Sequence, residues 1–255
     1  MFKFENTFEL AKNDFKSRYA GNFLGVFWAF LYPCITVGLY WFVFRVILKS
    51  GGEGDSPYIL WLVSALVPYL FFADCLAGSA SAITDYSYMI KKVRLDVAAL
   101  PAARIISYLF IHGIFLALLL AVEVALGYGF KVRDLWLIYY VAAELVFIGA
   151  VGYLLAALTV FFRDVRNIAG VFIQIGYWLT PLFWDINSAG TAVGRLITVI
   201  NPFSYITEGF RSVILGTPIA DSAFSSIYFW GLTAVLIIVT AAMYSRLKNR
   251  FADFI

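Results

Sequence analysis

Charged residues are scarce in this sequence. Asp, Glu, Lys and Arg make up 14% of its 255 residues, whereas hydrophobic residues make up 62%. A soluble domain carries about 25% charged residues, so this chain has too few of them to cover its core in water. We therefore expect a bilayer to be its solvent, where backbone groups must pair within helices or closed barrels. Long continuous apolar runs, rather than alternating ten-residue segments, favour helices.

The sequence also lacks the residues of several common catalytic sites. It contains one histidine, His112, and two cysteines, Cys34 and Cys75, which lie in apolar runs and form no CxxC pair. There is no GxxxxGK[ST] motif to cradle nucleotide phosphates, and no Ser/His/Asp or metal-ligand pattern. We expect a chain that is not an enzyme and has no metal, no cofactor of its own and no nucleic-acid partner. His112 is expected to be a packed residue of an apolar span.

Six apolar segments predict an all-α membrane protein with six transmembrane helices. Each segment approaches or exceeds the roughly 20 residues that a spanning helix needs. Polar or turn-rich interruptions separate them, such as Gly51–Pro57. The expected spans are residues 22–48, 58–82, 101–128, 135–162, 168–184 and 223–244, within one transmembrane domain over residues 22–255.

An amphipathic segment over residues 1–21 precedes the first span. One of its helical faces is apolar and largely aromatic, comprising Phe4, Phe8, Ala11, Phe15 and Tyr19. Charged and polar residues, among them Lys3, Glu9, Lys12, Asn13 and Lys16, occupy the rest, which predicts an interfacial helix lying on the membrane. The alternative interpretation is a helix that packs on a partner protein.

The segment between the fifth and sixth spans, residues 185–221, is less apolar and rich in Gly, Pro, Ser and Thr. It contains two apolar runs, Val193–Ile200 and Pro202–Leu215, each too short to cross a bilayer. We expect two short re-entrant helices that dip into the outer leaflet, packed in protein or lining an aqueous cavity. A plain external loop is the alternative.

The distribution of positive charge orients this layout. Most of the 19 Lys and Arg residues fall on the side that holds both termini. Because Lys and Arg are enriched in cytoplasmic loops, both termini are expected to face the cytoplasm. An even number of spans agrees with this orientation.

The longest polar interruption, Asp85–Arg104, lies between the second and third spans. Its apolar residues recur at three- and four-residue steps, and its basic residues fall off that face. This pattern predicts a short amphipathic helix on the cytoplasmic side. An ordinary basic loop is the alternative interpretation.

Three stretches carry a family resemblance: Arg18–Pro33, Phe161–Trp184, and the Asn-Pro pair at Asn201 and Pro202. With the layout, they resemble the membrane subunit of an ABC-2 type transporter. The resemblance is closest to permeases that export lipid-linked polysaccharides such as O antigens, capsules and teichoic acids. It implies a homodimer in a bacterial plasma (inner) membrane, driven by two ATP-binding cassette subunits that hold ATP and Mg.

The resemblance also implies which residues couple the permease to its ATPase. In similar permeases the segment between the second and third spans docks on the ATPase. The candidates there are Tyr86, Met89, Lys91, Lys92 and Arg94. The break at Arg163, Asp164 and Arg166 would be a second contact; alternatively, Arg163 and Asp164 pair with each other and cap a helix end.

A polyprenyl diphosphate-linked glycan would need cations for its diphosphate and flat apolar faces for its sugars. Arg18 is the candidate diphosphate contact, because an Arg fork matches phosphate oxygens; the alternative is an anchor to ordinary headgroups. Aromatic residues of the first, second and fifth spans are candidates to line a channel, and the alternative is lipid-facing packing. The chosen residues are Trp28, Tyr32, Tyr40, Tyr69, Phe72 and Tyr177.

Three acids within spans, Asp74, Glu123 and Glu144, raise a competing hypothesis. Intramembrane acids often serve proton relays, which would make the chain a secondary transporter that needs no ATPase. No inverted repeat or pair of broken helices accompanies them, so contact with an aqueous path or between helices is the favoured interpretation. A further competitor is an ABC-2 exporter of a small drug or lipid.

Overall fold

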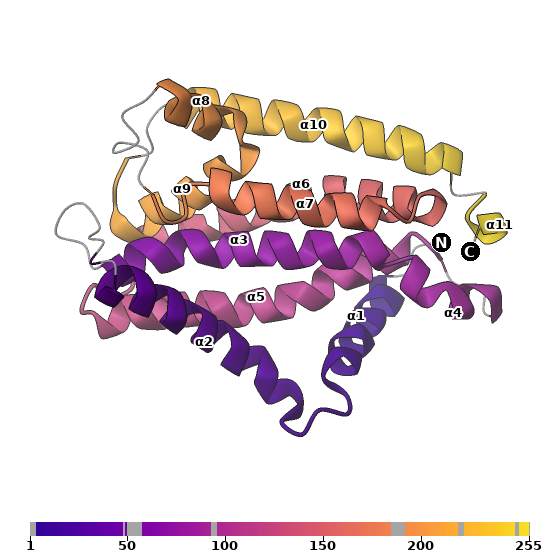
Figure 1. Ribbon diagram of the computed structural model, residues 1–255, viewed down its shortest axis with the longest axis horizontal. Helices are drawn as coiled ribbons and strands as arrows, with labels where there is room; N and C mark the ends of the chain where they lie inside the picture. Colours follow the sequence, from indigo (N-terminus) through magenta and orange to yellow (C-terminus); the bar gives the residue numbers. More distant parts are fainter. Residues whose placement is uncertain are drawn as a thin grey trace.

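The structure, a computed structural model, describes residues 4–47, 49, 58–92, 96–184, 192–218, 222–247 and 250–254. Within these ranges all regular structure is helical, which confirms the predicted all-α class. Most of the long helices run roughly along the long axis of the molecule, and α2 splays away from them (Figure 1). The two chain ends lie at the same end of this bundle (Figure 1).

Within the described residues, five helical stretches are long and apolar enough to cross a membrane. They are Gly25–Ile47, Tyr58–Ser81 (α3), Ala99–Ala125 (α5), Val132–Phe161 and Ala223–Leu247. Helix α6 (Trp136–Phe161) follows the short helix η4 (Val132–Leu135), and α10 covers Ser222–Leu247. These stretches coincide, within a few residues at each end, with the predicted first, second, third, fourth and sixth spans.

The predicted fifth span, residues 168–184, corresponds to α7 (Val165–Leu179). This helix has 15 residues, fewer than the roughly 20 that cross a bilayer unaided. It returns alongside α6 and packs against α3 and α6. The number of crossings therefore remains a prediction for this segment.

The first long stretch is less regular than the sequence suggests. It begins with a turn of 3-10 helix, η1 (Gly25–Phe27), continues as α2 (Trp28–Trp41) and ends in a π-helical segment, η2 (Phe42–Ile47). Much of α2 is exposed in the single chain, including Phe30, Tyr32 and Leu39. A helix that is apolar and unburied within its own chain needs lipid or another protein surface around it.

Helix α3 is the centre of the bundle. It packs against α5, α6, α7 and α9, and its residues Leu60, Leu66 and Tyr69 belong to the main hydrophobic cluster. A helix that is apolar on all sides is buried in protein or lipid; here protein surrounds most of it. The remaining helices are positioned largely by this contact.

Two short helices close one end of the bundle (Figure 1). They are α8 (Ala192–Ile200) and α9 (Pro202–Leu215), close to the two predicted helical runs. The Asn201 side chain accepts a hydrogen bond from the Phe203 amide at 3.0 Å and donates to Thr180 Oγ1 at 2.8 Å. Pro202 takes the first helical position, where its missing N–H costs nothing. The Asn-Pro pair is thus the start signal of α9.

Arg211 fixes α9 against the rest of the bundle. Its side chain is only 4% exposed and stacks over the Trp61 ring with 3.8 Å between guanidinium carbon and ring centroid. It donates to the carbonyls of Trp61 at 3.1 Å and Leu182 at 2.9 Å, and it pairs with Glu208. A buried cation needs such a set of partners. Whether α9 dips into a membrane leaflet remains a prediction.

The opposite end of the bundle holds α1 (Phe4–Tyr19), η3 (Thr84–Tyr86), α4 (Ser87–Lys92) and α11 (Phe251–Phe254) (Figure 1). The aromatic face of α1 packs on α5, because the rings of Phe8 and Phe15 lie 5.9 and 5.7 Å from that of Phe110. In α11, Phe251 is 1% exposed and packs with Ile83 and Val160.

Candidate functional site at the α1–η3–α4 end

An ionic network joins four segments at the end of the bundle that holds α1 and η3. The Arg104 guanidinium of α5 pairs with Asp14 of α1 at 3.2 Å and with Asp85 of η3 at 3.1 Å. Asp85 also pairs with Arg166 of α7 at 3.6 Å and accepts a hydrogen bond from Ser81 at 2.7 Å. A displacement of η3 must therefore disturb contacts with α1, α5 and α7 together.

Asp14 is the buried anion of this network, with 4% of the residue exposed. It pairs with Arg18 and accepts a hydrogen bond from the Tyr86 hydroxyl at 2.9 Å. Burial by itself raises the pKa of the Asp14 carboxyl, but the hydrogen bond and charge of Arg18, with the charge of Arg104, bring that pKa below its ordinary value. The carboxylate is thus held ionised.

Two predicted coupling residues belong to the network: Arg166, through Asp85, and Tyr86, through Asp14. Burial, reinforced by the neighbouring Asp14 carboxylate, raises the pKa of Tyr86 to about 12. The phenol therefore stays protonated and donates its hydrogen bond at physiological pH. Its contact ties η3 to α1 across a sequence separation of 72 residues.

Arg18, the predicted diphosphate contact, has several partners inside the protein. It pairs with Asp14, donates to Ser107 Oγ at 2.9 Å and lies over the Tyr108 ring at 3.5 Å from the centroid. Its side chain is 18% exposed. These contacts give Arg18 a structural role at the α1–α5 junction, and its contact with a diphosphate remains a prediction.

The other predicted coupling residues of this segment are described less fully. Met89, Lys91 and Lys92 lie on α4, but their side chains fall outside the described part of the structure. Arg94 lies outside the described residues altogether. The expected short helix is present as α4, which follows η3 directly.

The predicted second contact shares Arg166 with the network. Arg163 and Arg166 line a cavity of about 410 Å³ together with Thr84, Ser87 and Phe254. Arg166 also donates to Thr84 Oγ1 at 3.2 Å. This cavity thus brings the α6–α7 break next to η3, so the two predicted contact segments form one surface.

Asp164 and Arg163 do not behave as a helix-capping pair. Asp164 holds the N-cap position of α7 without a side-chain cap hydrogen bond. Both residues are exposed, and no salt bridge joins them within the ranges that the structure covers. The contact of Arg163 and Asp164 with the ATPase stays a prediction.

The predicted channel aromatics divide into two groups. Trp28 and Tyr32 are exposed on α2. The other four pack against one another and their neighbours: Tyr69 lies 5.6 Å from Tyr177 and 5.9 Å from Phe72, and Tyr40 lies 6.3 Å from Tyr177, between ring centroids.

Tyr69 occupies the inner side of that aromatic group. It is 1% exposed and its hydroxyl donates to the Ile173 carbonyl of α7. A side chain buried in one protomer cannot face a path between two protomers in this conformation. Its ring instead supports Tyr177, which is only partly covered.

The intramembrane acids occupy different surroundings. Glu123 and Glu144 are fully buried, and their carboxyl oxygens have no hydrogen-bond partner in the described structure. Asp74 is exposed on α3. His112 is buried, with its ring stacked on Phe71 at 4.3 Å between centroids, in line with the expected packing role.

Sequence reasoning missed three members of the network: Asp14, Asp85 and Arg104. Asp14 lies four residues before Arg18, a spacing that places both on one helical face. This spacing alone was enough to predict their ion pair. Asp85 and Arg104 are the first and last residues of the polar interruption. Nothing in their spacing indicates that they meet each other or Asp14.

Two comparisons with known proteins bear on these observations. Residues 5–215 match the family described as ABC-2 type transporter. The chain is 26% identical over 246 residues to the O-antigen export system permease protein RfbA of Myxococcus xanthus, covering 96% of this chain and 92% of that protein. It is 23% identical over 252 residues to the protein of the same name from Klebsiella pneumoniae, covering 96% and 93% respectively.

Proposed function

The chain belongs to the ABC-2 type transporter family, and we propose that it is the permease subunit of an ATP-driven exporter of lipid-linked polysaccharide. The observation that carries this proposal is its similarity to two O-antigen export permeases over 96% of the chain. The five long apolar helical stretches in the described part of the chain agree with a multi-pass membrane subunit. O antigen is the cargo that the relatives' names suggest.

We further propose that ATP and Mg are held by a separate ATPase, two copies of which serve two copies of this chain. The sequence supports this division of labour because it contains no GxxxxGK[ST] motif. Energy would then reach the permease only through protein contacts. With Lys and Arg concentrated on the side of the termini, that side would face the cytoplasm of a bacterial cell, where the ATPase lies.

The ionic network would transmit the movement of the ATPase. A displacement of η3 and α4 by the ATPase would move Asp85, which is paired with Arg104 of α5 and Arg166 of α7. Through Arg104 the same displacement would reach Asp14 and so α1. The cavity lined by Arg163 and Arg166 lies beside η3 and would receive part of the ATPase surface.

The exposed aromatic face of α2 supports a path between two protomers. Trp28 and Tyr32 are exposed in the single chain, as are Phe172 and Trp178 on α7. Sugar rings stack on such flat faces, and a homodimer would place two sets of them around one path. Tyr40 and Tyr177 would line its wall, with Tyr69 and Phe72 as support behind them.

A cell-based export assay tests this function. In a strain that lacks the native gene, complementation with the wild-type chain should restore polysaccharide at the cell surface. In the uncomplemented strain, glycan should accumulate on its lipid carrier inside the cell. Normal surface polysaccharide without the gene would refute the function, and restored export of only a small drug or lipid would favour the competing transporter class.

The coupling segment is tested in the same strain. Reversing Lys91 and Lys92 to Glu should abolish export while ATP hydrolysis by the purified complex continues, because the permease no longer follows the ATPase. The matched variant with Arg at both positions keeps the charge and should export normally. Full export by the Glu variant would remove these residues from the coupling surface, while leaving the transport function itself intact.

A further inference from the structure

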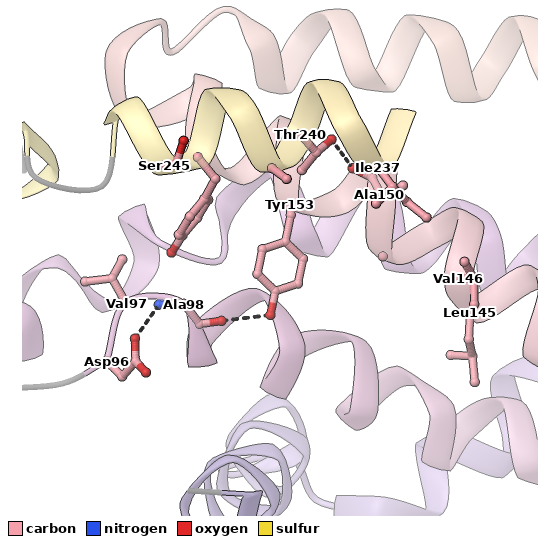
Figure 2. Close-up of a pocket in the computed structure, with 13 residues that line it drawn as sticks. Asp96, Val97, Ala98, Leu145, Val146, Ala150, Tyr153, Ile237, Thr240 and Ser245 are labelled. Carbon is pink, nitrogen blue, oxygen red and sulfur yellow. Dashed lines mark hydrogen bonds between the residues drawn. The ribbon is translucent and has the colours of Figure 1, made fainter. Parts of the chain in front are cut away.

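A cavity of about 780 Å³ lies between α6, α10 and the residues that lead into α5 (Figure 2). Its volume is within the usual range of small-molecule sites, about 300–1,000 Å³. Its walls are fixed by hydrogen bonds: Thr240 donates to the Ala150 carbonyl at 2.8 Å, and Tyr153 donates to the Ala98 carbonyl at 2.8 Å. None of its lining residues belongs to the ionic network or to the aromatic path.

One part of this cavity is apolar and another is polar. Leu145, Val146, Gly149 and Ile237 line the apolar part, toward the middle of α6 and α10. Asp96, Tyr244 and Ser245 line the polar part, near the beginning of α5 and the end of α10. The site therefore suits an amphiphile that is aligned with the helix axes.

The length of the cavity matches an acyl chain that extends through one leaflet of a bilayer. The lining runs from Leu145 to Tyr153 on α6 and from Ile237 to Ser245 on α10. At 1.5 Å per residue each run is about 12 Å long. One leaflet of the hydrocarbon core is about 15 Å thick, half of about 30 Å. An acyl chain in this cavity would place its head at the end of the bundle where Asp96 lies.

The polar groups that line the cavity indicate which lipid headgroup it can bind. Among the described residues that line the cavity, Asp96 carries the single charge, and it is exposed. The Tyr244 hydroxyl is buried without a hydrogen-bond partner in the described structure. An occupant that satisfies both must present a cationic donor to Asp96 and an acceptor to Tyr244.

We propose that this cavity binds one acyl chain of a phospholipid with a primary-amine head, of the phosphatidylethanolamine type. The ammonium group pairs with the Asp96 carboxylate, and an ester or phosphate oxygen accepts the Tyr244 hydrogen bond. The acyl chain lies along Gly149 and Ile237. This site differs from the path proposed for the cargo, and it does not depend on what the transporter exports.

Lipid retention by the purified full-length chain tests the proposal. Native mass spectrometry is carried out after mixing with phosphatidylethanolamine, phosphatidylglycerol or phosphatidylcholine. The wild type should retain phosphatidylethanolamine at least about tenfold more strongly than phosphatidylglycerol, the ratio expected for gaining one charge-assisted hydrogen bond. Preference for phosphatidylglycerol, or equal retention of phosphatidylcholine, which has no N–H donor, would overturn the head assignment.

A glycine pair tests the acyl chain position. A Cβ at Gly149 or at Gly231 would meet no atom within 4 Å, so a side chain can start at either position without a clash at its Cβ. Only Gly149 lines the cavity. Gly149→Leu on α6 should lose the bound lipid. Gly231→Leu, on α10 and outside the cavity, should keep it. Equal retention by both variants, or equal loss from both, would overturn the site.

Two conservative variants test the head contacts without filling the cavity. Asp96→Asn keeps an oxygen for the Ala98 amide, which Asp96 Oδ1 accepts at 3.1 Å, but removes the charge. It should reduce the preference for phosphatidylethanolamine about tenfold. Tyr244→Phe keeps the ring contact with Phe251 and should weaken retention of all three lipids. Unchanged retention by both variants would overturn the proposal even if Gly149→Leu could not be purified.

Discussion

Arg104 and Asp85 pair at 3.1 Å, although they lie 19 positions apart in the sequence. They are the last and first residues of the polar interruption Asp85–Arg104, so their salt bridge holds η3 against the first turns of α5. Asp14 shares the same guanidinium, which attaches α1 to this junction. Both ends of the proposed coupling segment are therefore held at the same ionic network.

Removal of the Arg104 charge should destabilise the protein. In Arg104→Met the buried Asp14 loses one of its two cations and Asp85 loses its closest one. Breaking a buried ion pair costs about 3–5 kcal/mol. Because Asp85 is partly exposed, we expect a loss of stability near the lower end of this range. The thermal midpoint in detergent should fall clearly, whereas Lys16→Met, at an exposed position of α1, should leave it unchanged. Equal midpoints for the two variants would contradict the structural role of the network.

The contribution of Asp14 should depend on pH. Because the pKa of Asp14 is lowered in the folded protein from its ordinary 3.8, the unfolded chain takes up a proton first as pH falls. The stabilisation is complete above about pH 5 and is lost as pH falls through the folded pKa. The difference in thermal midpoint between wild type and Asp14→Asn should therefore shrink as the pH falls from about 5 through the folded pKa. A difference that stays constant over this range would exclude the carboxylate charge as its source.

The start of α9 should depend on both hydrogen bonds of Asn201. Asn201→Ala removes the helix cap and the bond to Thr180 and should cost about 1–2 kcal/mol, since loss of a cap alone costs about 1. Asn201→Asp keeps the capping oxygen and loses the amide donor, so its thermal midpoint should lie between those of wild type and Asn201→Ala. Identical midpoints for the two variants would show that the cap contributes nothing.

Close packing of α9 on α6 should be visible at Gly209. A Cβ at this position would overlap the ring of Tyr140, which is itself buried. Gly209→Ala should therefore destabilise the chain by about 1–3 kcal/mol, the usual cost of overpacking. Gly113→Ala on α5 meets no atom within 4 Å and should not lower the thermal midpoint. A tolerated Gly209→Ala would show that α9 is displaced from α6.

Long apolar runs were sufficient to predict the helices and most of their ends. Their period and length distinguish a helix from a strand, so α3, α5 and α6 lie within a few residues of prediction. Hydropathy does not distinguish a lipid-facing side chain from one buried in protein, because both are apolar. For that reason the aromatic face of α1 was assigned to the membrane surface, whereas in the structure it packs on Phe110.

Charges that meet through tertiary contacts were not predictable from spacing. Arg211 lies in the short apolar run Pro202–Leu215, where no pattern indicates a partner, yet it is buried against the Trp61 ring and two carbonyls. Arg104 and Asp14 are 90 positions apart in the chain, and only the packing of α1 on α5 brings them together. Local patterns indicated that the α3–α5 segment was polar, and the fold determined which of its charges pair.

Phe251 has a practical consequence for anyone who modifies this chain. Its ring lies against Tyr244 and Phe161. A reporter or affinity tag attached directly after it would therefore disturb this packing. Fusions at that terminus should carry a flexible spacer, and truncations before residue 251 should be avoided, since they would leave Ile83 and Val160 uncovered.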